Sequence, residues 1–391
     1  MWLLFNIVFT LGEYPQDWLS SGFKALGQAV GQFMPDGMLK SLIVDGIIGG
    51  AGEVLVFLPN ILLLFLGIAL LEDTGYMARV AFIMDRIMRA VGLHGKSFIP
   101  LVLGLGCTVP AVMSTRTLDN HRDRLVTILV LSLMSCSARL PVYTVLIAAF
   151  FAEKYAGTIL FSIYLFGIIL AILMARIFRS TLFRGEAEPF VMELPSYQAP
   201  VLKNLILNMW ERSVIYIKKA GSIILAASIL MWFLTSYPAP ANYHNETVSI
   251  TTESTTERLS QSYAERIGHF IEPVLRPLGF DWKIGIGLFA GFAAKEVMVS
   301  TLATIYSVGD DETGANLREH LANDPNINPL VAYTLMIFFL VYAPCLPTIV
   351  VIWRETNSLK WASFSLVYTT FLAWMLSFLV YQTGSLLKIG V

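Results

Sequence analysis

Residues 104–111 read Gly-Leu-Gly-Cys-Thr-Val-Pro-Ala and interrupt an apolar stretch that runs from 97 to 115. Two glycines and two prolines fall within eleven residues of this stretch, so a continuous helix through it is disfavoured. Glycine permits close backbone approach, and proline leaves a helical carbonyl without its donor. We predict a broken helix that presents polar backbone and a thiol inside the fold, through Gly104, Gly106, Cys107 and Pro110. A packing kink around a buried thiol is the alternative.

The composition of the whole chain places this break in a membrane. Of the 391 residues, 56% are hydrophobic and 14% are charged, whereas soluble domains carry about a quarter charged residues. A net charge of −1 provides no basic surface for nucleic acid, and three cysteines cannot form a disulfide framework. The chain is therefore expected to be an all-α polytopic membrane protein: a channel, a transporter, a membrane enzyme or an intramembrane scaffold.

Hydrophobicity predicts seven further segments long enough to cross a bilayer. They are 53–71, 125–150, 156–178, 214–236, 284–306, 329–352 and 361–381. The first 40 residues are different, because only residues 1–11 are continuously apolar. We expect 1–40 to hold the second half of a helix followed by a short amphipathic helix at the membrane interface, with Trp18 as an anchor.

The distribution of charge predicts the topology. Arginine and lysine flank the stretch 97–115 on both sides, whereas acidic or neutral residues flank 284–306 on both sides. Because cytoplasmic loops are enriched in basic residues, each stretch is expected to enter and leave by one face, the first from the cytoplasm and the second from outside. Loops 237–283 and 307–328 are expected outside.

Two stretches that re-enter from opposite faces are typical of an inverted-topology repeat. Met113-Ser114-Thr115 resembles Val299-Ser300-Thr301, and the stretch 139–143 resembles 345–349. We therefore expect two gate modules with broken or re-entrant helices. The first covers 41–180 and the second covers 214–391, with a cytoplasmic linker at 181–213.

Two further stretches combine a cysteine with prolines inside expected spans. Residues 135–141 read Ser-Cys-Ser-Ala-Arg-Leu-Pro, and residues 344–347 read Pro-Cys-Leu-Pro. A cation at membrane depth needs a cavity or a partner, and small serines also serve helix packing. Thiols select soft or borderline cations such as Fe(II), Zn(II) or Cu(I). The candidate residues from these stretches are Ser135, Cys136, Ser137, Arg139, Pro141, Pro344, Cys345 and Pro347.

Carboxylates next to apolar sequence supply candidate hard ligands. Glu53 and Glu296 are candidates for the metal, whereas Glu72 and Asp73 either line the pathway or mark the end of a helix. Glu296 follows Lys295 directly, so the two could also form a self-neutralising pair without a role in transport.

Other chemistries are disfavoured. Residues 90–97 fit a relaxed phosphate-loop pattern, but a basic amphipathic helix precedes them where that loop requires a strand. The five histidines show no metal-site spacing, and no expected span contains a histidine that could act as the base for a serine nucleophile. No resident cofactor and no enzymatic activity are expected.

At these motifs the sequence resembles the membrane domain of FeoB-type ferrous iron transporters. The resemblance rests on residues 52–60, 71–79, 92–97, 104–111, 135–141 and 294–296, and it covers nearly the whole chain. It implies two gate modules similar to nucleoside-transporter cores, arranged as inverted repeats. It also implies that Cys107 and Cys136 are the gate cysteines connected with Fe(II) passage.

The resemblance further implies function and partners. The expected function is inward Fe(II) transport across a bacterial inner membrane by a multi-pass protein, through a pathway lined by thiols and carboxylates. GTP would act only through a cytosolic G domain, which these residues do not contain. Either that domain was removed, or it is a separate polypeptide, or the start of the chain is misassigned. Small accessory Feo proteins and further copies of the chain are the other expected partners, besides lipid. A nucleoside or other organic-solute carrier is the alternative.

Overall fold

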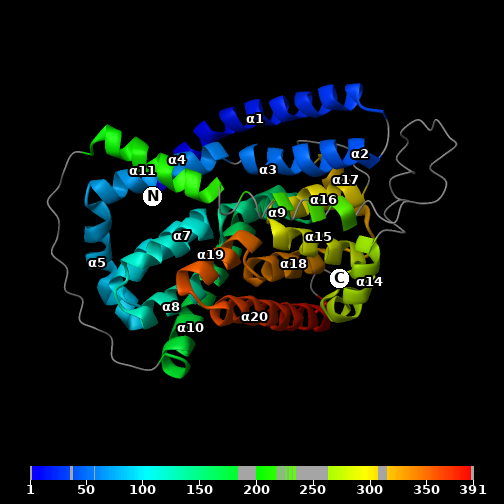
Figure 1. Ribbon diagram of the computed structural model, residues 1–391. Coiled ribbons are helices and arrows are strands. Elements are labelled where there is room, and N and C mark those ends of the chain that lie inside the picture. The colour runs from blue at the N-terminus through cyan, green and yellow to red at the C-terminus, as the bar shows by residue number, and fades with distance from the viewer. Residues whose placement is uncertain are drawn as a thin grey trace.

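The computed structural model describes residues 2–35, 38–56, 58–183, 200–217, 263–306 and 315–388, with single residues between 221 and 234. Every regular element within these ranges is a helix (Figure 1). The α-helices are α1 (Trp2–Phe33), α2 (Met38–Ser41), α3 (Gly50–Val56), α4 (Leu58–Asp73), α5 (Tyr76–Val91), α6 (Phe98–Gly106), α7 (Thr108–Ser114), α8 (His121–Leu131), α9 (Leu140–Phe150), α10 (Glu153–Thr181), α11 (Leu202–Tyr216), α14 (Tyr263–Leu275), α15 (Trp282–Ala293), α16 (Val297–Ile305), α17 (Ala315–Asn323), α18 (Pro329–Val341), α19 (Leu346–Thr356) and α20 (Leu359–Leu386). The all-α class predicted from the composition is confirmed.

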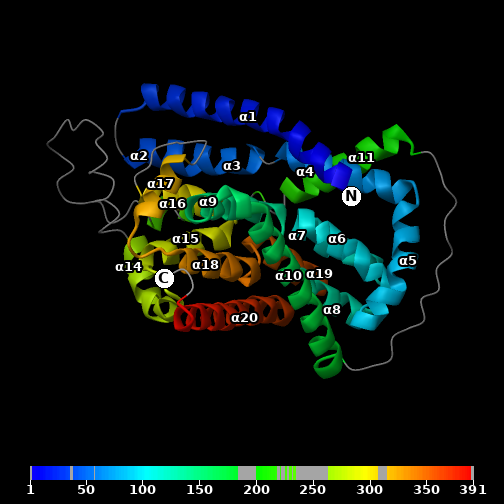
Figure 2. The same cartoon turned by 180° about the vertical axis from the view of Figure 1, so that it is seen from behind.

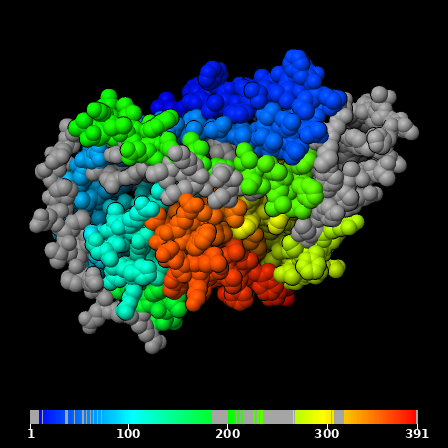
Figure 3. Space-filling model, viewed as in Figure 1, coloured from blue at the N-terminus to red at the C-terminus, as the bar shows by residue number. Residues whose placement is uncertain are grey.

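Four broken helices form the centre of the molecule. They are the pairs α6 and α7, α8 and α9, α15 and α16, and α18 and α19, each interrupted by a few residues without α-helical structure. In both views most of their length lies between α1 to α3 along one edge and α20 along the other (Figures 1 and 2). Figure 3 shows that α19, in orange, reaches the surface of one face.

Two of these pairs are hairpins whose ends lie together. Lys96, just before α6, forms an ion pair of 2.8 Å with Asp119, which follows α7. At the other hairpin, Lys283 in the first turn of α15 lies 4.4 Å from the ring centroid of Tyr306, which follows α16. The two ends of each segment therefore lie together, and entry and exit by one face of the membrane stays a prediction. The first hairpin adjoins α5 and the second adjoins α14, at opposite ends of the molecule in Figure 1.

Helices long and apolar enough to cross a membrane agree with part of the predicted set. They are Glu153–Thr181, Pro329–Thr356 and Leu359–Leu386, which cover the predictions 156–178, 329–352 and 361–381. A further candidate is α4 together with α5, but these helices meet at 78°. The predicted span 53–71 corresponds to the end of α3 and most of α4. Helix α5, beyond the bend, lies outside the predicted span.

One predicted continuous span is wrong in form, because segment 125–150 is broken between α8 and α9. The reason is Pro141, which occupies the first turn of α9, where a missing N–H costs no hydrogen bond. Segment 284–306 is broken between α15 and α16, as expected for a broken or re-entrant helix. The N-terminal region also differs, because α1 continues unbroken across residue 11 where two separate elements were expected. About half of segment 214–236 lies outside the described residues, as do residues 237–262 and 307–314 of the two loops expected outside, and the side of the membrane that these loops face stays a prediction.

One hydrophobic core joins the two halves of the chain. It contains Leu133 and Tyr143 from the first half and Phe339 and Ala373 from the second, all at or below 1% exposure. Helix α9 contacts both α16 and α18, and α7 contacts α19. Side chains at the four helix breaks are therefore held by a common packed interior rather than by two independent bodies.

Candidate functional site

The breaks at Cys107 and Cys136 are joined by one hydrogen bond. Cys107 separates α6 from α7 in an extended conformation (φ −148°, ψ 130°). The Ser137 hydroxyl donates to the carbonyl of Gly106 at 2.8 Å, and this is the carbonyl that Pro110 cannot bond across a helical turn. The carbonyl freed by the proline thus receives a side-chain donor, which brings the second cysteine-containing break against the first.

The third cysteine lies in the break between α18 and α19. The Cys345 sulfur lies 3.0 Å from the Thr348 hydroxyl in the first turn of α19. Cys345 interacts electrostatically with Cys136 and Glu296, and Cys107 does so with all three of these groups. All three thiols are free and partly buried. The hydrogen bond from Ser137 to Gly106 joins the breaks that hold Cys136 and Cys107, and Lys295 Nζ, 4.7 Å from the ring centroid of Tyr342, joins the break that holds Glu296 to the break that holds Cys345. The breaks therefore meet in pairs, although Cys107 and Cys345 are 238 positions apart.

These donors do not form a closed coordination shell. Among the described residues, no three histidine, cysteine or acidic side chains are placed to hold one metal ion together. A resident structural metal usually has four protein ligands in tetrahedral contact. Here the thiols and the carboxylate lie instead on separate helix breaks. Such an arrangement suits weak binding of a metal ion at several successive points.

Two cations are buried beside these donors. Arg139 and Lys295 are each 2% exposed. Arg139 donates from Nη1 to the carbonyl of Met134 at 3.1 Å, while its Nε has no partner among the described residues. Lys295 Nζ lies 4.6 Å from the ring centroid of Phe339 and 4.7 Å from that of Tyr342. A cation at membrane depth requires a cavity or a partner. Here the partner of Arg139 is a backbone carbonyl, and the partners of Lys295 are two aromatic rings.

The predicted pairing of Lys295 with Glu296 is not observed. The two residues form the turn between α15 and α16, and neither a hydrogen bond nor an ion pair connects their side chains. Sequence reasoning did not find the role of the aromatic residues that surround Lys295, because Phe339 and Tyr342 follow it by more than 40 positions and look like ordinary span residues.

The remaining candidates differ in burial and in their distance from the breaks. Ser135 is buried with its hydroxyl unpaired among the described residues, and Pro110, Pro344 and Pro347 are buried at the breaks. Gly104 allows α6 to approach α8, since a Cβ there would lie 3.0 Å from Leu131. Pro141 is exposed, and Asp73 ends α4, a helix that packs against α1 and α11. The side chains of Glu53 and Glu72 lie outside the described residues.

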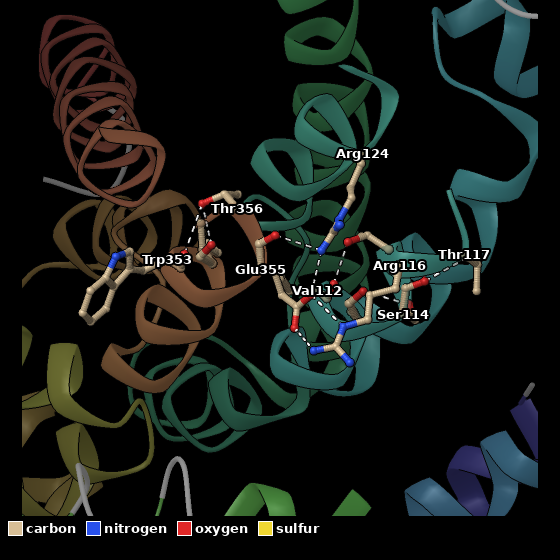
Figure 4. A network of polar contacts seen from close by, with 11 residues as sticks. Val112, Ser114, Arg116, Thr117, Arg124, Trp353, Glu355 and Thr356 are labelled. Carbon is tan, nitrogen blue, oxygen red and sulfur yellow. Dashed lines mark hydrogen bonds and ion pairs between the residues drawn. The ribbon is translucent and has the colours of Figure 1, made fainter. Parts of the chain in front are cut away.

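A polar clamp not found from the sequence joins the halves of the chain at the ends of α7 and α19 that lie away from Cys107 and Cys345. Glu355, at the end of α19, accepts from Arg116 at 2.8 and 2.5 Å and from Arg124 at 2.7 Å (Figure 4). Arg124 also donates to the backbone carbonyl of Glu355 at 2.9 Å. The Glu355 side chain is 4% exposed, so the clamp fixes α19 against the start of α8 and the turn after α7.

Comparisons with known proteins identify the family of the chain. A family model described as "Nucleoside recognition" matches residues 54–150 and 217–359, and one described as "Ferrous iron transport protein B C terminus" matches 160–212. The chain is 48% identical to an Fe(2+) transport protein A/Fe(2+) transporter FeoB fusion protein of Porphyromonas gingivalis, over 99% of the chain and 49% of that protein. It is 45% identical to the Fe(2+) transporter FeoB of Campylobacter jejuni, over 97% of the chain and 61% of that protein.

A third relative, the Fe(2+) transporter FeoB of Leptospira interrogans serovar copenhageni, is 44% identical over 99% of the chain and 57% of its own length. The chain thus spans about half to three fifths of these relatives. No solved structure matches it. The helical architecture, the four broken helices and both family models point the same way. The chain is a multi-pass membrane protein that belongs to the FeoB family of ferrous iron transport proteins and matches the C-terminal part of its members.

Proposed function

We propose that this chain carries Fe(II) inward across a bacterial inner membrane, through a pathway that passes the breaks of its four broken helices. The observation that supports the proposal is that the four breaks, which carry three free thiols and one carboxylate, contact one another in pairs, through Ser137 and Gly106 and through Lys295 and Tyr342. Fe(II) is a borderline cation that accepts both thiolate and carboxylate ligands. The relatives that the chain matches over nearly its whole length are named Fe(2+) transporters.

The separation of the donors fits transport better than storage. An ion that crosses a membrane must bind firmly enough to enter and weakly enough to leave. Cys107, Cys136 and Cys345 lie on three different broken helices, and Glu296 lies on the fourth. We expect the ion to exchange one or two ligands at a time as it passes, with solvent or backbone carbonyls completing its coordination. No permanently bound cofactor enters the proposal.

The expected partners follow from the family. The relatives are longer than this chain, and one is named as a fusion with Fe(2+) transport protein A. We expect a cytosolic GTP-binding domain, in the same or a separate polypeptide, to control opening of the path. Small Feo proteins and further copies of the chain are the other expected partners. Any GTP hydrolysis would belong to that domain and not to the residues described here.

Nucleoside transport is not favoured as an alternative. The description of one family model mentions nucleosides, but a purine or pyrimidine site needs amide and carboxylate groups arranged around a flat ring. The breaks of this chain carry cysteines instead, and their buried hydroxyls and cations stand beside those thiols.

The test is anaerobic uptake into proteoliposomes that contain only this chain. Fe(II), Mn(II), Zn(II) and a radiolabelled nucleoside are compared for the wild type and a Cys107→Ser/Cys136→Ser variant. We expect Fe(II) uptake that the double substitution lowers at least about tenfold while the protein keeps its elution profile and Tm.

A Ser385→Ala variant serves as the matched control, since that hydroxyl lies near the end of α20 and away from the breaks. Nucleoside uptake without Fe(II) uptake would overturn the proposal. Equal Fe(II) uptake by the wild type and the double variant would exclude the two thiols from the pathway. If a wild-type chain that is folded takes up nothing, adding a relative's purified G domain with GTP decides between a closed path and a wrong substrate.

A further inference from the structure

The ammonium group of Lys295 occupies surroundings that suit a transported cation. It is 2% exposed, and it has no hydrogen-bond partner among the described residues. The faces of Phe339 and Tyr342 lie 4.6 and 4.7 Å from Nζ. Burying a charge without a hydrogen-bonded partner is costly, so a purely structural lysine is expected to pair with an acid or reach water. Lys295 does neither.

The groups around Lys295 are the proposed metal ligands. It interacts electrostatically with Cys345, Cys136 and Glu296. It lies two residues after the C-terminus of α15, whose dipole favours a positive charge, and two residues before the N-terminus of α16, whose dipole opposes it and favours the carboxylate of Glu296. These surroundings form a cation site, because they combine the C-terminal end of a helix, thiol sulfur, a carboxylate and aromatic faces. The cation in this site is the ammonium group of Lys295.

On the basis of the proposed function, we infer that Lys295 is a tethered cation that competes with the transported metal for this site. The ammonium group stabilises the thiol and carboxylate region while the path is empty. A divalent ion arriving at Glu296, which follows Lys295 directly in the chain, or at Cys345, three residues after the Tyr342 ring that the ammonium group faces, repels it, because like charges interact strongly in a protein interior. When the ion moves on, the ammonium group returns and replaces it.

Arg139 limits where the displaced charge can go. Its side chain is as deeply buried as Lys295, interacts with it electrostatically, and is held through Nη1 by the Met134 carbonyl. Lys295 therefore has a fixed positive neighbour and cannot withdraw toward it. The aromatic pair offers binding without directional hydrogen bonds, so leaving costs less than breaking an ion pair would. Both features suit an ammonium group that must yield to a metal ion.

If Lys295 competes with the metal, removing its charge should tighten metal binding. If Lys295 only supports the site, the same change should weaken metal binding. A Lys295→Met variant removes the charge and keeps most of the volume, so metal should bind more tightly. We expect its Kd to fall about tenfold to a hundredfold, and its uptake to show a lower KM together with a lower kcat, because release becomes slow. Lys295→Arg keeps the charge and should stay within about threefold of the wild type.

The experiment measures binding of Co(II) by its thiolate charge-transfer absorption, and then Fe(II) uptake, with the full chain under anaerobic conditions. Lys154→Met, on the exposed first turn of α10, is the matched control. Tyr342→Leu provides a second route, since it weakens the hold on the ammonium group without changing any charge, and it should also lower the Kd. That variant decides the matter if Lys295→Met does not fold.

The outcomes separate this inference from the proposed function. If the wild type shows no thiolate absorption with Co(II) and no Fe(II) uptake, the proposed function fails. If the wild type binds metal and both Lys295→Met and Tyr342→Leu bind it equally well or more weakly, the tethered cation is wrong while the transport pathway stands.

Discussion

At the scale of single residues, the polar clamp at Glu355 stands out for its unequal arms. Each arginine makes two contacts with Glu355, but the Arg116 side chain is 58% exposed, so solvent screens its contribution, whereas the Arg124 side chain is 23% exposed. A carboxylate buried to this degree is stabilised chiefly by Arg124. The clamp therefore depends on one well-buried pair rather than on the number of contacts.

We predict that Glu355→Ala destabilises the chain by about 2 kcal/mol, because it leaves the guanidinium group of Arg124 without its charged partner. The measurement is thermal unfolding in detergent, compared with Arg116→Ala, for which we expect less than about 1 kcal/mol. Equal Tm values for Glu355→Ala and the wild type would show that the contacts in Figure 4 contribute nothing to stability.

At the scale of the elements, the sequence predicted where helices break better than how they pack. Glycine and proline act locally, so the break at Cys107 and the proline-flanked cysteine at Cys345 could be found from the sequence. The contact of Lys295 with Phe339 and Tyr342 joins distant spans, and no local signal marks it. The same holds for the clamp, which joins residues more than 230 positions apart.

The inverted repeat stays a prediction, and the elements give it support. Cys107 and Ala294 end α6 and α15 in nearly the same conformation, with φ of −148° and −147°. Three residues earlier in each helix stands a glycine that admits close contact, Gly104 against Leu131 and Gly291 against Phe339. The second repeat thus has alanine where the first has its thiol, and places Lys295 and Glu296 directly after it.

The hairpin of α15 and α16 offers a test by pH. Asp324 lies between α17 and α18 and accepts hydrogen bonds from the Asn326 N–H, the Tyr306 hydroxyl and Lys283. Burial raises the pKa of Asp324, but these hydrogen bonds outweigh it, so the pKa lies below its ordinary value. The stabilisation is then complete above the unfolded-state pKa of about 3.9 and is lost as the pH falls through the lower folded-state value.

We therefore predict that Asp324→Asn lowers stability by about 1–3 kcal/mol at pH 6, and that its difference from the wild type shrinks as the pH approaches 3. Amide hydrogen exchange in α17 and the first turn of α18 is the measurement. Glu319→Gln, which changes an exposed carboxylate on α17, is the control and should show no such change. A difference that is independent of pH would argue that the carboxylate is not the group responsible.

At the scale of the whole molecule, the shared core bears on how the path opens. Rigid-body rocking of two modules requires an interface that can repack, as in transporters with alternating access. Here the largest hydrophobic cluster runs through both halves, with Leu133 and Tyr143 packed in the same core as Phe339 and Ala373. Motion confined to the helix breaks, where few backbone hydrogen bonds must be exchanged, disturbs this core less.

This argument predicts the effect of a covalent staple. The hydroxyls of Ser132, which follows α8, and Ser365, on α20, lie 3.1 Å apart and are buried, so a Ser132→Cys/Ser365→Cys variant places two thiols within reach of a disulfide. If motion is confined to the breaks, oxidised protein keeps Fe(II) uptake within about twofold of the same protein after reduction. Wild-type protein given the same oxidant controls for damage to Cys107, Cys136 and Cys345, and mass spectrometry verifies the bond. Uptake that is lost on oxidation and restored by reductant would contradict motion confined to the breaks at Cys107, Lys295 and Cys345, because the staple joins α20 to Ser132, the first residue of the break between α8 and α9, and leaves those three breaks free.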